Sequence, residues 1–232
     1  MTTGVVDRAL VAETGAIPDG FKLIRDVMPL KIVDSKQVMK ESAGEESIPV
    51  MRLTGVFQKA DEKNANGRVY PLSVLTKAVE DLQEAITERR VMGEFDHPPD
   101  AKIHLENVSH LITRIWMEGK TCMGELEVLE RMPKGAMLKA LIESNVQVGI
   151  SSRGIGDMEM KENDGEECYE VQPGFTLVTW DSVAEPSVSG TQLMVLESLA
   201  RKKMMKSRKK RLSGKQITER KIITEVHNML WS

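Results

Sequence analysis

Two adjacent serines have the surroundings that a nucleophile needs. The segment from Val148 to Gly154 reads Val-Gly-Ile-Ser-Ser-Arg-Gly. Glycines beside a serine let the backbone turn sharply and leave room for another chain to approach. A hydroxyl in such a place, surrounded by free backbone N–H groups, can act as a nucleophile if a base lies near. We therefore take Ser151 and Ser152 as candidate nucleophiles.

His97 is the best candidate for the base. It follows Asp96 and is followed by Pro98 and Pro99. Proline fixes its own backbone angle and restricts the residue before it, so the backbone at His97 is stiff. A fixed imidazole suits a general base, because its ring must meet the hydroxyl proton at hydrogen-bond distance.

A third residue should orient the imidazole, as a carboxylate does in a serine hydrolase triad. Asp181, in the segment Thr-Trp-Asp-Ser-Val at 179–183, is our choice. Asp96 and Glu185 stay open as alternatives.

A run of histidines and carboxylates raises the alternative of a metal site. Its members are His97, His104 and His110, with Glu94, Asp96, Asp100 and Glu106. The run contains no HExxH motif and no two histidines four residues apart, and its spacings fit no standard zinc motif. We therefore expect no metal and no other cofactor, and keep a metal-dependent hydrolase as the weaker alternative.

The composition is that of a globular protein. Of the 232 residues, 41% are hydrophobic and 29% are charged, so the chain can bury a substantial core. Cys122 and Cys168 form no CxxC pair and are expected to be free thiols in a reducing compartment. No apolar run approaches the length of a membrane span, so we expect a soluble, cytoplasmic protein with no membrane partner.

One stretch is strongly basic although the net charge of the chain is only −3. From Arg201 to Arg211, Lys or Arg occupies most positions, without interleaved aromatic residues. Attraction to an acidic protein surface explains this stretch as well as nucleic acid does. We do not expect nucleic acid as a partner.

The spacing of apolar residues predicts an α+β fold. Expected strands cover 48–58, 91–95, 108–118, 121–129, 146–152 and 175–184, with one or two more between 21 and 38. Helical spacing predicts helices over 71–90, which begins with Pro71, and over 133–144. Strands and helices do not alternate regularly, so we predict a small antiparallel, barrel-like sheet.

The two ends of the chain differ from its middle. Residues 1–20 show no clear periodicity and end in the turn sequence Ile-Pro-Asp-Gly, which indicates a loosely held leader. We expect residues 21–197 to form the folded domain. Residues 198–232 would then be a C-terminal tail, basic at 201–211.

Three motifs, in this order, resemble those of the prohead (capsid maturation) proteases of tailed bacteriophages, most closely the T-even type. They are Gly-Glu-Phe-Asp-His-Pro at 93–98, Val-Gly-Ile-Ser-Ser-Arg-Gly at 148–154 and Trp-Asp-Ser-Val-Ala-Glu-Pro-Ser at 180–187. The resemblance covers roughly residues 48–196. It implies a serine endopeptidase whose fold is similar to that of herpesvirus assembly proteases, a small barrel surrounded by helices.

By matching position, the resemblance implies that Ser151 is the nucleophile, His97 the base and Asp181 the third member. It places Arg153 and the N–H groups from Ser152 to Gly154 where an oxyanion develops. Ser152 stays open as the nucleophile, because only the glycine register separates the two serines.

The resemblance also implies a preference for cleavage after Glu, with an aliphatic residue two positions earlier. The chain itself contains such sequences at Glu13, Glu143 and Glu197. The first and last lie at the expected domain boundaries, where we expect self-cleavage, whereas the second lies at a helix end and should be protected.

Phage scaffold, core and capsid proteins would be the substrates, inside the immature prohead in the host cytoplasm. Formation of a homo-oligomer stays open. The alternative from another class is a non-catalytic scaffold or capsid-interaction protein, in which the serine and histidine are structural.

Overall fold

The computed structural model describes residues 6–28, 31–42, 45–163 and 166–184, which all belong to one compact unit formed by residues 1–194. The expected basic tail and Glu197 lie outside the described residues. Of the helices in the described part of the chain, none is long and apolar enough to cross a membrane.

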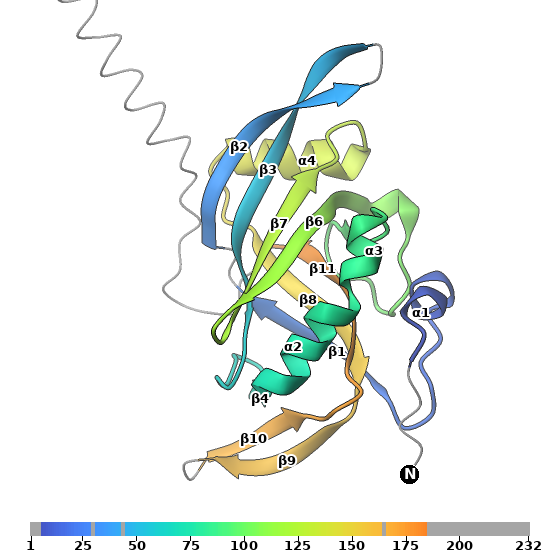
Figure 1. Cartoon of the computed structure of the whole chain (residues 1–232), viewed down its shortest axis with the longest axis vertical. Helices are drawn as coiled ribbons and strands as arrows, with labels where there is room; N and C mark the ends of the chain where they lie inside the picture. Colours follow the sequence, from blue (N-terminus) through green and yellow to red (C-terminus); the bar gives the residue numbers. More distant parts are fainter. Residues whose placement is uncertain (1–5, 29–30, 43–44, 164–165, 185–232) are drawn as a thin grey trace, which may run out of the picture. The chain divides into compact units, whose positions relative to one another are not determined.

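The two serines lie on a central strand, β8 (Gly149–Gly156), between β1 (Lys22–Met28) and β11 (Thr176–Val183). Both neighbours are antiparallel to β8 (Figure 1). All eight residues of β8 are buried. We expected this strand over 146–152 with the serines near its end. The strand instead begins at Gly149 and continues past the serines, because its second half is paired with both neighbours.

A second sheet has five strands in the order β2-β3-β7-β6-β5. Its strands are β2 (Lys31–Ser42), β3 (Glu45–Lys59), β5 (Met92–Glu94), β6 (Val108–Glu118) and β7 (Thr121–Val128). The expected hairpin between β6 and β7 is present, and Gly119 takes the left-handed φ of 59° that its turn requires.

A third, smaller sheet has the order β4-β10-β9, with β4 (Arg68–Val69), β9 (Met158–Asn163) and β10 (Glu166–Val171). The strands of the described residues therefore form three sheets, and the expectation of one barrel-like sheet is wrong. The first two sheets meet through an isolated bridge between Phe95 and Ser182 and not through a continuous ladder, so no barrel closes among the described strands. The likeness to herpesvirus assembly proteases stays a prediction.

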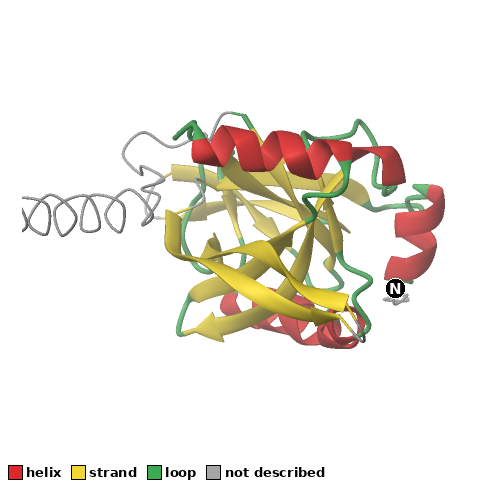
Figure 2. Ribbon diagram, turned by 90° about the horizontal axis from the view of Figure 1, so that it is seen from above, coloured by secondary structure: helices red, strands yellow, loops and turns green. Residues whose placement is uncertain are grey.

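Helices lie on two sides of the strands (Figure 2). The expected helix over 71–90 is present as α2 (Leu72–Asp81) and α3 (Gln83–Thr87), with Leu82 between them. Both pack against β6, and α4 (Pro133–Glu143) packs against β6 and β7. A 3₁₀ turn, η1 (Leu105–Asn107), precedes β6.

The N-terminal segment is not the loosely held leader that we expected. Residues Arg8–Thr14 form a helix, α1, which Asp7 caps at one end and Gly15, with a left-handed φ of 74°, at the other. Val6 and Val11 are buried in an apolar cluster with three residues of the domain: Ala101, Ile155 and Val178. Burial of these side chains outweighs the weak helical pattern of so short a segment.

Candidate active site

The structure brings Ser151, His97 and Asp181 together from three segments. Ser151 and Asp181 are directly opposite each other on β8 and β11. His97 follows β5, and its Nε2 contacts Ser151 Oγ while its Nδ1 lies 3.0 Å from Asp181 Oδ2. With Nδ1–H donated to Asp181, Nε2 is the atom that can accept the serine proton.

The loop after β5 fixes the direction of the His97 side chain. Asp96 has a left-handed φ of 73°, its N–H donates to Ser182 O at 2.7 Å, and its Oδ1 accepts the N–H of His97 at 2.9 Å. Asp tolerates this backbone region better than most residues. Pro98 O accepts a hydrogen bond from Arg25 Nη1 at 2.8 Å. Asp96 thus orients the backbone of His97, while Asp181 contacts the ring.

The oxygen of the Asp181 carboxylate that does not face His97 accepts two hydrogen bonds. Asp181 Oδ1 accepts the N–H of Glu94 and Nη2 of Arg153, both at 3.0 Å. Asp181 is fully buried, so these bonds leave Oδ2 directed at His97. Glu185, the remaining alternative for the third member, lies outside the described residues.

Arg153, which we expected beside an oxyanion, contacts carboxylates and backbone carbonyls. Its side chain is fully buried, with Nη2 3.0 Å from Glu94 Oε1 and Nη1 2.6 Å from Lys102 O. The backbone from Ser152 to Gly154, also expected at the oxyanion, is paired with both β1 and β11. These N–H groups therefore lie within the hydrogen-bonded ladders of the sheet.

The buried charges around His97 do not cancel while its imidazole is neutral. Asp181 and Glu94 carry two negative charges, and Arg153 supplies one positive charge. Each of the three is buried to within 1% of complete exclusion from solvent. An imidazolium at His97 would balance the remaining negative charge.

Ser152 points to the other face of β8. Its Oγ donates to Asp26 O at 3.4 Å. The Asp26 carboxylate is bound by Tyr70 Oη and by Arg68 Nη1, the latter at 2.6 Å. Burial, and then the Asp26 charge, raise the pKa of Tyr70 well above its ordinary value. No imidazole of the described residues contacts Ser152, so the geometry separates the two candidate nucleophiles.

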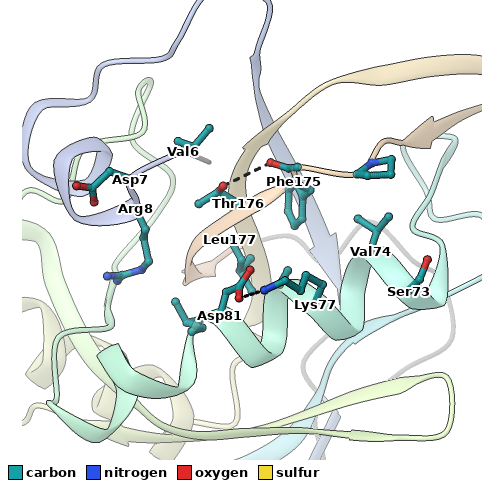
Figure 3. Close-up of a pocket in the computed structure, with 14 residues that line it drawn as sticks. Val6, Asp7, Arg8, Ser73, Val74, Lys77, Asp81, Phe175, Thr176 and Leu177 are labelled. Carbon is teal, nitrogen blue, oxygen red and sulfur yellow. Dashed lines mark hydrogen bonds and ion pairs between the residues drawn. The ribbon is translucent and has the colours of Figure 1, made fainter. Parts of the chain in front are cut away.

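The hydroxyl of Ser151 is closed to solvent, whereas the His97 side chain is 16% exposed. A pocket of about 430 Å³ adjoins His97 and is lined by Phe95, Asp96, Pro98, Pro99, His104, Asn107 and Lys134. A larger cavity of about 840 Å³ lies between the start of α1, α2 and the start of β11, where Lys77 and Asp81 form an ion pair (Figure 3). None of the three converging residues lines that larger cavity.

The other two histidines of the suspected metal run have separate partners. His104 lies 3.5 Å from Glu94 Oε2 and 3.7 Å from Asp100 Oδ2. His110 is fully buried, with Nε2 donating to Trp180 O and Nδ1 accepting from Ser109 Oγ. Burial lowers the pKa of His110 to about 4. Within the described ranges no three His, Cys, Asp or Glu side chains form a group that could hold a metal ion.

The two described glutamates that match the expected cleavage sequence have similar surroundings. Glu13 is exposed in the last turn of α1, and Glu143 is exposed at the end of α4. In both places the bond after Glu lies at the end of a helix.

Sequence reasoning missed Glu94 as a partner of this site. We considered it only as a metal ligand, although it lies three residues before His97. Its N–H and its carboxylate hold Asp181 and Arg153, respectively. The signal was present: a glutamate inside an apolar strand must find a buried partner.

Comparisons with known proteins all match proteases of the phage prohead or of capsid assembly. A model of the family "Prohead core protein serine protease" matches residues 2–199. The prohead core protein protease of Enterobacteria phage T4 is 32% identical over 165 residues, which cover 68% of this chain and 76% of that protein. The solved structure of the bacteriophage T4 capsid assembly protease matches with a TM-score of 0.63 at 26% identity, covering 71% of this chain and 99% of that one.

Proposed function

Because this chain belongs to the prohead core protein serine protease family, we propose that it is a serine endopeptidase of the phage prohead that cleaves after Glu. Its substrates would be the core, scaffold and capsid proteins among which it is enclosed, and its own chain. The names of its two T4 relatives, a prohead core protease and a capsid assembly protease, support this choice of substrates and location.

The observation that carries the proposal is the double contact of His97. One ring nitrogen contacts Ser151 Oγ, and the other lies 3.0 Å from a carboxylate that two further donors hold in place. A structural histidine needs neither a serine hydroxyl on one nitrogen nor a fixed carboxylate on the other.

In the proposed reaction, Ser151 Oγ attacks the carbonyl carbon of the substrate Glu, and its proton passes to Nε2 of His97. The imidazolium then gives this proton to the leaving amine, and the peptide stays on Ser151 as an ester. Water, deprotonated by His97, hydrolyses the ester and restores the hydroxyl. Asp181 holds the ring and stabilises the imidazolium.

The donors for the oxyanion lie outside the β8 ladder in this proposal. Backbone N–H groups that already bond to neighbouring strands are not free to bind a developing charge. Each free donor in such a site is worth about 3 kcal/mol of transition-state stabilisation.

Self-cleavage after Glu13 and Glu197 would remove both ends and leave residues 14–197. The sequences Val-Ala-Glu at 11–13 and Val-Leu-Glu at 195–197 support these positions, since each has an aliphatic residue two positions before Glu. The domain boundaries at 20 and 197 remain part of the proposal.

Intact-mass analysis of the stored protein tests the proposal. We expect the native chain to lose Met1–Glu13 and Ser198–Ser232, and Ser151→Ala to keep both. Ser152→Ala is the matched control, because it removes a hydroxyl from the same strand on the face without an imidazole. Equal trimming of the native chain and Ser151→Ala would overturn the serine mechanism. Native protein that cleaves neither itself nor capsid proteins would favour a non-catalytic scaffold role.

A further inference from the structure

The pocket beside His97 has the walls and donors that would suit an acidic side chain. Its apolar walls come from Phe95, Pro98 and Pro99, which can cover the methylene groups of a glutamate. His97 lines the same pocket, so a side chain seated there belongs to a residue close to the reacting bond. The volume of about 430 Å³ is ample for one side chain and its peptide group.

Lys134 is the cation of this pocket. It lies in the first turn of α4, is half-buried, and its Nζ lies 5.6 Å from the centre of the Phe95 ring. It forms no ion pair with any residue of the described ranges. Several other lysines of the described residues form ion pairs with carboxylates, as Lys77 does with Asp81. Lys134 therefore keeps its charge available for a ligand.

Asn107 gives the pocket a second uncommitted donor. Its backbone is used, since its O accepts the N–H of Phe95 and its N–H donates to His104 O. Its side-chain amide bonds to no residue in the described part of the chain. A lysine and an amide above apolar walls can bind a carboxylate through charge-assisted and neutral hydrogen bonds together.

Two other ionisable groups, Asp96 and His104, face the same pocket and limit what it can bind. Asp96 would repel a carboxylate, but its Oδ1 accepts the N–H of His97 and its side chain is exposed to solvent. His104 lies near the carboxylates of Glu94 and Asp100 and is shared with them. Lys134 is the cation of this pocket that has no carboxylate partner among the described residues.

Arg25 is the competing cation near His97. It is exposed, and its Nη1 is bound to Pro98 O at 2.8 Å. It does not line the pocket, and it lies on β1, across from Arg153. It offers a surface charge and no enclosed space for a side chain.

We propose that Lys134 is the specificity-determining residue of this site and pairs with the carboxylate of the substrate glutamate before the scissile bond. This inference rests on the proposed function. Pairing with a charged group in a partly enclosed site should favour Glu over Gln in kcat/KM by about 10- to 100-fold. The reacting groups stay in place, so cleavage of the Gln substrate should be nearly independent of Lys134.

The test compares three peptides with full-length enzyme variants. The peptides are Val-Leu-Glu-Ser, from the sequence at 195–198, and its counterparts with Gln or Lys in place of Glu. Lys134→Ala should bring the Glu/Gln ratio of kcat/KM close to one, and Lys134→Glu should make a peptide with Lys at that position the best of the set. Lys139→Ala, on the same helix outside the pocket, and Arg25→Ala should keep the native ratio.

The outcomes separate this inference from the proposed function. A native enzyme that prefers Glu, with the ratio retained in Lys134→Ala, overturns the role of Lys134 and leaves the protease intact. A ratio lost in Arg25→Ala instead also overturns it. A native enzyme that cleaves neither peptide nor itself contradicts the proposed function, and this inference fails with it.

Discussion

The two faces of β8 carry adjacent serines in opposite settings. On the front face, defined by Ser151 and Arg153, the hydroxyl meets an imidazole that is partly exposed beside a pocket. On the back face, defined by Ser152, the hydroxyl meets a backbone carbonyl above the Asp26–Tyr70 pair. Both faces bury a carboxylate with an arginine. The difference is that, among the described residues, a histidine contacts the serine hydroxyl on the front face and not on the back face.

A buried and hydrogen-bonded carboxylate alone therefore does not identify the face that we propose to be reactive. Asp26 is bound by Tyr70, Arg68 and Asn66, as completely as Asp181 is bound by its own partners. Such a network stabilises the join between β1 and the β4 turn. What distinguishes Asp181 is one oxygen left for a histidine.

The two serines give the largest expected difference. Ser151→Ala should lower kcat for peptide cleavage by roughly a millionfold, because it removes the nucleophile of the triad. Ser152→Ala should change kcat by less than about tenfold, since it loses only a long hydrogen bond. Steady-state kinetics, with circular dichroism as a check on folding, would measure both. Equal losses in the two variants would break the distinction between the faces.

Replacing Arg153 tests whether the front face depends on its buried cation. Arg153→Met should lower the free energy of unfolding by about 3–5 kcal/mol, because Glu94 and Asp181 would face each other uncompensated. Arg153→Lys should unfold less readily than Arg153→Met and show an altered pH profile of kcat, since a point charge cannot hold both carboxylates in the same geometry. Denaturant titration and pH–rate profiles check these effects. An unchanged profile in Arg153→Lys would reduce Arg153 to a packing role.

His110 lies on β6 and connects to β11 beside Asp181, so its charge state should affect the front face through the backbone. Burial lowers its pKa in the folded protein to about 4, below the ordinary value of 6.5. As pH falls below 6.5, the unfolded chain binds a proton that the folded chain refuses, and stability declines until pH 4 is reached. The decline from this group amounts to about 3 kcal/mol.

Unfolding titrations at pH 7 and pH 4.5 on the native protein and His110→Gln would measure this decline. We expect a smaller pH dependence in the variant, which has no titrating group at this position. The same pH dependence in both proteins would contradict the assignment of a buried, neutral His110.

Tyr70→Phe should have the smallest effect and should confine it to stability. The variant loses the phenol that binds Asp26, at a cost of about 1–3 kcal/mol. Because the back face holds no reacting group in our proposal, kcat of the folded enzyme should stay within about twofold of native. Thermal denaturation and kinetics on one preparation would test this. A large loss of kcat without loss of stability would show that the back face acts on the reaction.

Local patterns predicted the strands and helices better than their arrangement. The alternation over 108–118 and 121–129 matches β6 and β7, because a hairpin is fixed by neighbours in sequence. The division into three sheets depends on pairings between distant strands, such as β1 with β8, which no local pattern encodes. The break at Leu82 likewise arises where Gln83 bonds to Ile115 O on β6.

For the candidate site, too, local patterns identified residues better than they identified the contacts between them. Ser151, His97 and Asp181 could be selected from residue type and motif order, and the geometry brings them together, although their catalytic roles stay a proposal. Glu94 carried a signal as a glutamate in an apolar strand, but the partners of Glu94 and Arg153 could not be predicted, because their contacts join residues of different strands. No sequence pattern singled out Lys134, because its proposed role depends on a pocket that it lines together with the loop at 95–99, far from it in the chain.

The position of Glu13 in α1 sets a condition on when the proposed self-cleavage after Glu13 could start. The bond after Glu13 lies where Thr14 Oγ1 donates to Leu10 O and Gly15 N–H donates to Val11 O. A protease needs an extended peptide, so this turn must fray before it can be cut, and Val11 must leave its apolar contacts. The local opening equilibrium of one short helix would then govern the delay between synthesis and maturation. Amide exchange at Gly15 would measure the free energy of that local opening.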